Sequence, residues 1–447
     1  MADGTTSVLP NNFSLPAIGG VQFSVNNPST PTTVRLTGAI SGGASGQIFT
    51  LAESNATNNQ NNILILDNAF STFTGTILLN RGTLAFTSDG ALGNPANPIR
   101  HDTWNLNGSL RFDANNITLN AARQITLVSA NNVMPFNTQT YNGSIAGPIT
   151  GPGDFVKEGT GTLVLNNASI TYTGTTTVNA GTLKIDGAMS SSATATVLVN
   201  AGTTLSGSGS VIRPVTCYGT IAPGGSPGTL TTGATSLFGT LAIDLSATSS
   251  DKLSVTGNLT LGAASTLTVN LLSGGFSGTS CIIAECTGTL SGTFSSAPAG
   301  YVISYTSNQI ILSHIPGYAL WAAAKGLDGS VGKESGFTDD PDHDGIPNGI
   351  EFVLDGNPLA SDHAHDPTIA VSADHITFTF TRRDDAVYLN PHAEFASNLT
   401  GPWTAVSDGV NGSVAVQSNG SAPDTVTVTI PRGNNPRMFV RLSVTNP

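Results

Sequence analysis

YTGTTTVNAGTLKI, residues 172–185, repeats with few changes the stretch FTGTILLNRGTLAF at residues 73–86. The later copy has no side chain that could carry out a reaction at neutral pH, so its repetition indicates architecture. Leu183 and Ile185 fall on one face of an extended strand and Lys184 falls on the other, because side chains alternate along a strand. Glycines mark the corners where the backbone turns. The phrase therefore predicts short β-strands of about four to six residues, separated by tight turns.

The repeat extends over residues 40–86 in the earlier copy, which carries an Asn-rich insertion near residues 54–62, and over residues 149–185 in the later one. The matched apolar positions are Leu64 and Leu66 with Leu163 and Leu165, Phe73 with Tyr172, Leu79 with Val178, and Leu84 and Phe86 with Leu183 and Ile185. Similar runs follow at residues 197–211, 218–233, 239–272 and 288–313. Such short strands must stack, either as hairpins of a sandwich or barrel or as rungs of a solenoid. Hairpin dipeptides such as Asn-Gly are few, which favours the solenoid.

The pattern G-x-G-T-L-x-L-x-x-A, followed by (Y/F)-T-G-x-T-x-(V/L)-N-x-G-T-L, resembles the autotransporter-associated β-strand repeat. The run IAPGGSPGTL at residues 221–230 resembles a segment found in the passenger regions of such proteins, and the strands around Asp251-Lys252-Leu253 are similar to the end of those passengers. The resemblance covers residues 40–313. It implies an all-β fold, a right-handed parallel β-helix.

Composition narrows the functional classes. Only 10% of the 447 residues are charged and the net charge is −12, with no Lys/Arg cluster, so we expect no nucleic-acid partner. No stretch approaches the ~20 apolar residues of a membrane helix, so we expect no membrane span. The N-terminus has neither a cationic start nor an apolar segment, and we expect an extracellular or cell-surface protein whose signal peptide is absent from this sequence. Cys217, Cys281 and Cys286 are expected to be isolated buried thiols.

One stretch carries chemistry, DPDHDGIPNGIEF at residues 340–352. Oxygen-bearing residues recur at the spacing of an EF-hand-type calcium loop, with a glycine at the sixth position, Gly345. The predicted Ca²⁺ ligands are Asp340, Asp342, Asp344, the carbonyl of Ile346, Asn348 and Glu351. The alternative is a solvated acidic turn before a helix. A single, unpaired loop favours a structural ion, and similar loops occur in dockerin-like and thrombospondin type 3-like modules.

These patterns divide the chain into four parts. We expect an N-terminal cap at residues 1–39, the β-helix at 40–313, a helical calcium-binding linker at 314–365 and a C-terminal β-sandwich at 366–447. The linker contains the Ala-rich stretch GYALWAAAKGLDG, which predicts a short helix. The final part alternates in the manner of strands.

Other polar clusters have simpler structural interpretations. Asp362-His363-Ala364-His365-Asp366 is interpreted as a polar linker, and Arg382-Arg383-Asp384-Asp385 as a strand end with local ion pairs. His101-Asp102 beside Trp104 is interpreted as a pair in a loop. Polysaccharide lyases and hydrolases also use parallel β-helices, but the acids of residues 105–250 form no dense cluster; they are Asp113, Asp154, Glu158, Asp186 and Asp244.

The sequence therefore predicts a secreted, non-enzymatic structural or adhesive β-solenoid. It would act as a cell-surface stalk, an adhesin passenger or a self-assembling fibre subunit. The expected partners are further copies of the chain at the open ends of the β-helix, and glycans or cell surfaces along its polar faces. The alternative is a polysaccharide-binding or polysaccharide-degrading β-helix protein.

Overall fold

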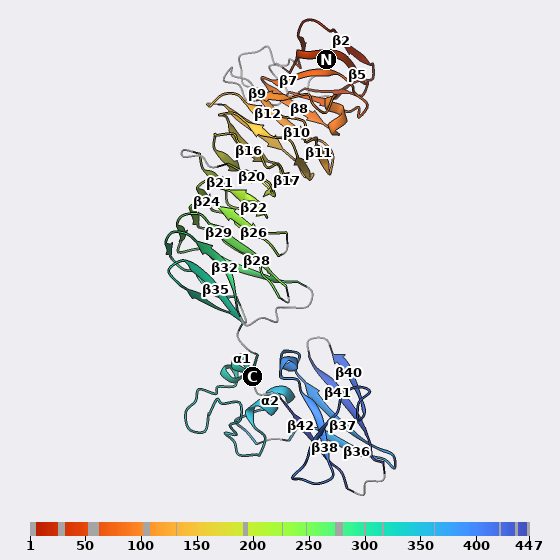
Figure 1. The fold of residues 1–447 in the computed structure, drawn as a ribbon, viewed down its shortest axis with the longest axis vertical. Coiled ribbons are helices and arrows are strands. Elements are labelled where there is room, and N and C mark those ends of the chain that lie inside the picture. The colour runs from red at the N-terminus through yellow and green to blue at the C-terminus, as the bar shows by residue number, and fades with distance from the viewer. Residues whose placement is uncertain are drawn as a thin grey trace. The chain divides into compact units, whose positions relative to one another are not determined.

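The computed structural model describes residues 6–25, 32–51, 62–101, 108–130, 132–190, 195–225, 227–246, 248–272, 280–298, 301–314, 317–361, 363–419, 422–433 and 437–444. The chain divides into two compact units, Met1–Ser313 and His314–Pro447 (Figure 1). The first is a parallel β-solenoid and the second combines two short α-helices with two antiparallel sheets. No helix among the described residues is long and apolar enough to cross a membrane.

The longest face of the solenoid is a 13-stranded sheet in which every pair of neighbours is parallel. In order along the stack, its strands are β1 (Thr6–Leu9), β4 (Thr33–Leu36), β6 (Ile63–Leu66), β8 (Gly82–Phe86), β10 (Gly108–Phe112), β13 (Val133–Asn137), β16 (Asp154–Glu158), β18 (Thr176–Val178), β21 (Val197–Val199), β24 (Val215–Cys217), β27 (Thr235–Leu237), β30 (Leu259–Leu261) and β33 (Leu290–Ser291). The sequence order equals the spatial order, which is the property that defines a coil of successive turns.

Two further faces complete the coil. The second is an 8-stranded sheet of β11 (Ile117–Leu119), β14 (Gly143–Ile145), β17 (Thr162–Leu165), β19 (Thr182–Ile185), β22 (Thr204–Gly207), β25 (Thr220–Pro223), β28 (Thr240–Leu245) and β31 (Thr266–Leu271). The third begins with β2 (Phe13–Leu15), β3 (Val21–Phe23), β5 (Ile40–Leu51), β7 (Thr74–Leu79), β9 (Ile99–His101), β12 (Ile125–Leu127) and β15 (Ile149–Thr150). It continues, through a bridge at Ile170, with β20 (Ala188–Met189), β23 (Ser210–Val211), β26 (Thr229–Thr232), β29 (Lys252–Val255), β32 (Ser280–Cys286), β35 (Gln309–His314) and β34 (Tyr301–Tyr305).

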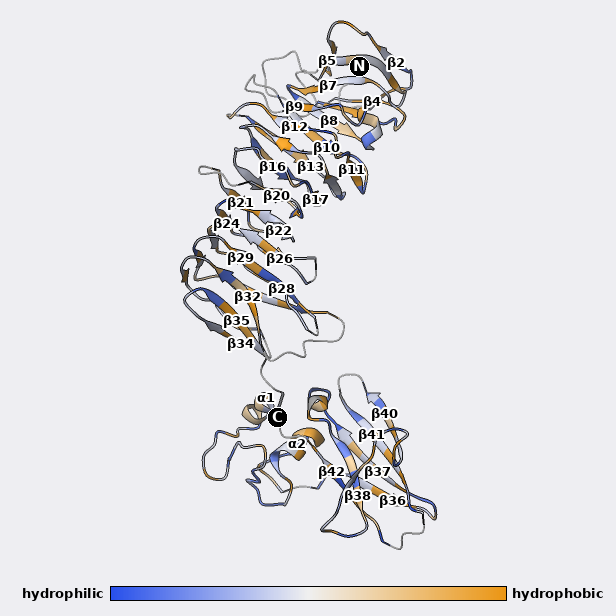
Figure 2. Ribbon diagram, in the orientation of Figure 1, coloured by the Kyte–Doolittle hydropathy of each residue, from blue (hydrophilic) through white to orange (hydrophobic). Residues whose placement is uncertain are grey.

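The repeated phrase places like residues on top of one another. Leu64 of β6 pairs with Leu84 of β8, and Leu163 of β17 pairs with Leu183 of β19, so each copy spans two successive rungs. These leucines are buried, and hydrophobic and hydrophilic residues alternate along the strands (Figure 2). The two copies nevertheless lie on different faces, since β6 and β8 belong to the 13-stranded sheet and β17 and β19 to the 8-stranded one. The parallel solenoid is confirmed, and an arrangement of hairpins over residues 40–313 is wrong for all but the end of the coil.

The two ends of the coil differ from each other. Strands before residue 40 pair in the same sheets as later strands, as β1 does with β4. At the other end β32 pairs in parallel with β29 but antiparallel with β35, and β35 then pairs with β34. This reversal ends the third face with an antiparallel hairpin. It replaces the edge that another parallel rung would use.

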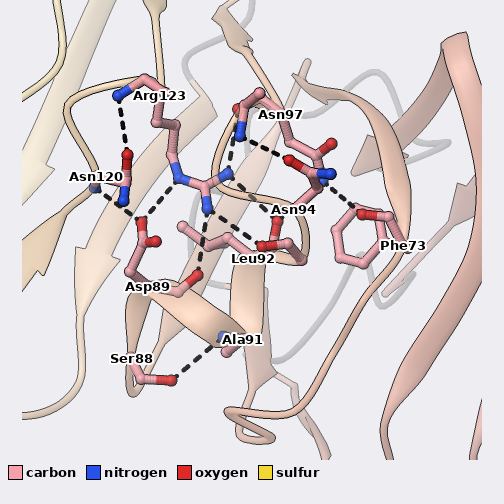
Figure 3. Close-up of polar contacts among 12 residues, drawn as sticks. Phe73, Ser88, Asp89, Ala91, Leu92, Asn94, Asn97, Asn120 and Arg123 are labelled. Atoms are coloured by element: carbon pink, nitrogen blue, oxygen red, sulfur yellow. Dashed lines mark hydrogen bonds and ion pairs between the residues drawn. The ribbon is translucent and has the colours of Figure 1, made fainter.

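The buried side chain of Arg123 connects two turns of the coil by hydrogen bonds (Figure 3). The 3₁₀-helix η1 (Asp89–Leu92) precedes the first strand of the 8-stranded sheet. The side chain of Arg123 is fully buried, and its Nε donates to Asp89 Oδ1 at 2.9 Å. Its two other nitrogens donate to the carbonyl oxygens of Asp89, Leu92, Gly93 and Asn97. Because every nitrogen of the guanidinium has an oxygen partner, a buried charge is tolerated here.

The second unit packs two helices beside two facing sheets. The helices are α1 (Gly317–Ala324) and α2 (Asn348–Leu354). One sheet has the order β36 (Thr368–Val371), β37 (His375–Arg382), β41 (Ala422–Pro431), β40 (Ser413–Asn419), and the other β39 (Thr404–Ala405), β38 (His392–Ala396), β42 (Phe439–Ser443). The 3₁₀-helix η2 (Asp384–Leu389) lies between β37 and β38 in the chain. Buried residues of both sheets form one core, among them Phe378, Val428 and Ala393.

Candidate metal centre

The predicted ion loop connects a turn after residue 339 to the start of α2. The left-handed backbone of Gly345, with φ of +91°, provides the sharp turn at the sixth position of the loop. Phe352 and Val353 of α2 are buried in a core that also contains Trp321 of α1, so the helix is held firmly behind the loop. The end of the loop is therefore fixed by packing.

Three carboxylates converge at the centre of the loop. Asp340, Asp342 and Asp344 each place an oxygen within 4.8 Å of the others, the one such group of three acidic, His or Cys residues among the residues described here. The Gly345 N–H donates to Asp340 Oδ2 at 3.0 Å and the Ile346 N–H donates to Asp344 Oδ1 at 2.8 Å. These backbone bonds fix the carboxylates, while Asp340 Oδ1 and Asp342 Oδ2 are buried without a donor.

Asn348, the ninth residue of the loop, carries a buried amide group at the start of α2. Its side chain is fully buried, and its Nδ2 donates to the carbonyl oxygens of Glu334 at 2.9 Å and Gly336 at 3.0 Å. Two carbonyl partners require the amide nitrogen on that side, so the orientation of the group follows from its contacts. Its Oδ1 is left buried without a donor.

Glu351 is the last predicted ligand and stands on α2. The residue is only 4% exposed, and its Oε2 is buried without a donor. Burial raises the pKa of this carboxyl to about 8, assisted by the negative charges of Asp342, Asp344 and Asp340. Burial also raises the pKa of Asp342. Four carboxyl groups close together repel one another when ionised, and a bound cation would offset that repulsion.

The donor set fits one class of ion. All of the side-chain ligands offer oxygen and none offers nitrogen or sulfur, which suits a hard divalent cation. Ile346, whose carbonyl is the predicted backbone ligand, is tied into the loop by its own N–H bond to Asp344. These oxygens could therefore hold an ion next to the start of α2.

Sequence reasoning missed the residues that support this loop. Lys325, one residue beyond α1, donates from Nζ to the Gly356 carbonyl at 2.7 Å, and its charge opposes the raised pKa of Glu351. A Cβ at Gly349 would lie 2.4 Å from the ring of Phe337, so only glycine allows this aromatic contact. Neither contact follows from the twelve-residue spacing, because both partners lie outside the loop.

The remaining candidates have structural partners. Arg382 pairs with Asp424 of β41 at 2.8 Å, and Arg383 pairs with Asp355 at 2.7 Å as well as with Asp385. The predicted ion pairs of this strand end are thus partly long-range. His363 pairs with Asp366 at 2.9 Å, whereas Asp362, like Asp102 and Trp104, lies outside the described residues.

The three cysteines form no disulfide bond. Cys217 and Cys286 are buried and Cys281 is half-buried, so the prediction of isolated thiols holds and that of complete burial fails for Cys281. Burial raises the pKa of the Cys217 thiol to about 12, which makes this group a poor nucleophile.

One segment of the solenoid has a known counterpart. Residues 155–185 match the model of the passenger-associated-transport-repeat family. The matched segment runs from β16 to the end of β19 and contains the phrase at residues 172–185. Together with the parallel coil, the match supports a passenger-type β-helix of the kind found in autotransporters. No curated protein matches the chain.

Proposed function

We propose that this chain is a secreted or surface-exposed, non-enzymatic structural protein. In this proposal a passenger-type solenoid supplies reach and a C-terminal unit is stabilised by calcium. The observation that carries the proposal is the uninterrupted parallel ladder of thirteen strands over one apolar core. Each further turn of such a coil needs only one short strand on each face, so the coil becomes long with a simple repeated sequence.

Three acidic residues of the solenoid are engaged in hydrogen bonds or ion pairs, which supports a mechanical role. Asp113 accepts bonds from Arg111 at 2.6 and 2.8 Å, and the Asp154 Oδ1 accepts the Thr175 N–H at 2.7 Å. Asp186 pairs with Lys184 at 2.8 Å. Asp113 and Asp186 are thus paired within their own turns and Asp154 bonds to the next turn, so these carboxylates are poorly placed to act as acid and base on a glycosidic bond.

Weak adhesion along the faces is the second element of the proposal. Hydroxyl and amide groups of successive turns bond to each other on exposed surfaces, as Thr240 does with Thr266 at 2.8 Å and Asn200 with Asn179 at 2.8 Å. These ladders form regular polar surfaces. Their repeated hydroxyl and amide groups suit many weak contacts with glycans or a cell surface.

Assembly through the ends of the coil is the alternative to a single, separate solenoid. One edge of the 13-stranded sheet is β1, where Val8 and Leu9 are 54% and 39% exposed. At the other end, the antiparallel pairing of β35 with β32 opposes head-to-tail stacking on the third face, because that face no longer ends in a parallel strand. These contacts favour single solenoids over a continuous filament.

Calcium is proposed as the ion of the C-terminal loop. The support is the set of buried, donor-free oxygens of Asp340, Asp342, Asn348 and Glu351. The ion would supply fixed positive charge at the start of α2 and no redox or hydrolytic chemistry. Extracellular calcium at millimolar concentration is sufficient for structural loops of this class.

The proposal is tested by incubating the full chain with pectin, alginate and chitin and analysing the products by mass spectrometry. Neither hydrolysis nor elimination products are expected. Turnover of any of these polymers at an enzyme-like rate would contradict the non-enzymatic assignment. Co-sedimentation with the same polymers tests adhesion separately. A chain that sediments with a polymer without degrading it binds that polymer and does not process it.

A further inference from the structure

The two facing sheets of the second unit are unequal in width. Four strands, β36, β37, β41 and β40, face three strands, β39, β38 and β42. Ile369 and Val371 of β36 pair with Phe378 and Ile376 of β37, so their side chains lie on the same inner face of the sheet. Phe378 and Ile376 are buried, yet Ile369 and Val371 are 54% and 62% exposed.

The reason for this exposure is the shorter facing sheet. Val440 and Leu442 of β42 face the core but are themselves only partly buried. Two hollows border β36 and β42. The larger, of about 650 Å³, is lined by Ile369 and Leu442 and also by the ion loop and α2, through Gly345, Ile346, Pro347, Ile350 and Leu354. The smaller, of about 460 Å³, is lined by Val371 and Met438 among others. Among the described residues, β42 pairs only with β38 and β36 only with β37. β42 is therefore an edge strand of its sheet, and its residues line both hollows.

Charge is distributed unevenly along this groove. Arg432 and Arg437 line its Val371 end, and none of the described residues that line this end is acidic. The opposite end contains Asp366 together with Arg441, and the charge of Arg441 is already paired with Glu394 at 2.7 Å. The Val371 end of the groove is thus cationic, whereas the other end contains residues of both signs of charge.

We propose that the groove between β36 and β42 binds an extended peptide strand of a partner protein. The peptide carries apolar side chains at every second position and a carboxylate at its C-terminal end. Backbone pairing with the free edge of β42 gives affinity, and the alternate apolar side chains cover Ile369 and Val371. Because every strand pair of this unit is antiparallel, the bound strand runs opposite to β42 and its C-terminal end lies by Arg437. The proposal is independent of the role assigned to the solenoid.

The test measures binding of a fluorescent peptide to the full chain by anisotropy. The probe is a synthetic peptide of about seven residues, with valine at alternate positions, threonine between them and glutamate at its C-terminal end. Val371→Asp is expected to weaken binding at least about tenfold, because it places a charge against the apolar side chains. The matched control is Val416→Asp on β40, a valine at the opposite edge of the same sheet that is also half-exposed, at 48%. This control should leave affinity unchanged.

Reversing the charge of Arg437 and of the probe's C-terminal residue tests the orientation of the bound peptide. Arg437→Glu should weaken the glutamate-ended probe about tenfold and should bind a lysine-ended probe more tightly than the wild type does. Hydrogen exchange along β42 should slow when the wild-type chain binds the probe, which reports backbone pairing directly. Absence of binding at millimolar peptide, or equal loss with Val416→Asp, would overturn the proposal. So would a dimer in light scattering that Val371→Asp abolishes, because it would assign the groove to a second copy of this chain.

Discussion

Removal of calcium should selectively weaken the second unit. A ligand that binds only the folded state stabilises it by about 2.7 kcal/mol when its free concentration is 100 times the dissociation constant. For a unit of the size of His314–Pro447, each kcal/mol corresponds to roughly 4 °C in melting temperature. We therefore expect an excess of EGTA to lower the melting temperature of this unit by about 10 °C. The transition of the solenoid should not move, since the proposed ligands all lie after residue 339.

The variant Glu351→Gln makes this prediction specific. It retains the shape of the buried side chain but removes one charged ligand, so the response to calcium should fall to less than about 2 °C. Asp384→Asn removes one negative charge from the same unit outside the loop and serves as the matched control, which should respond as the wild type does. Differential scanning calorimetry with and without EGTA measures all three proteins.

In the calcium-free protein, the direction in which stability changes with pH gives a further test. The pKa of Glu351 is raised to about 8 from its ordinary 4.5, so the folded state binds more protons than the unfolded state between these values. Stability in EGTA should therefore fall as the pH rises from about 5 to 8, and Glu351→Gln should reduce this fall. A wild-type melting temperature that does not respond to EGTA would refute the reasoning, because the buried oxygens would then need no ion.

The remaining predictions concern the solenoid. Arg123→Met should lower the free energy of unfolding, measured in urea, by about 3–5 kcal/mol, because it leaves Asp89 and several buried carbonyls without their donor. Arg35→Met, at the half-exposed pair with Asp67, should lower it by less than about 1 kcal/mol. Equal losses in the two variants would show that burial does not decide the effect. Gly161→Ala should destabilise the coil or prevent its folding, because the new Cβ would lie 1.7 Å from the Tyr141 carbonyl oxygen. At Gly225 a new Cβ meets no atom within 4 Å, so Gly225→Ala should leave the melting temperature nearly unchanged. Destabilisation by Gly225→Ala as large as by Gly161→Ala would contradict the close stacking of turns.

Local spacing explains why much of the fold could be predicted. The alternation around Leu183 and the glycines beside it specify a short strand and its corner, and repetition then specifies stacking. The proposed ion loop is likewise local, because a dozen consecutive residues bring Asp340, Asp342 and Asp344 together. Both patterns need no knowledge of distant contacts.

Contacts between distant residues explain what the sequence could not predict. The face on which a copy of the repeat lies depends on how many residues each corner uses, so Leu84 and Leu183 occupy different sheets despite matching phrases. Asp89 and Arg123 are separated by more than one turn of the coil, and their pairing follows from the register of stacking. The groove beside β42 arises because four strands face three, a count that no single strand encodes.

Electron microscopy of the full chain at micromolar concentration tests the central claim most directly. Twelve steps between the thirteen strands, each of about 4.8 Å, predict individual solenoid rods roughly 60 Å long. Their length should be the same in calcium and in EGTA, because the proposed ion site is not in the coil. Compact particles without a rod would contradict the continuous solenoid and the mechanical role built on it, and long filaments would favour assembly through the ends.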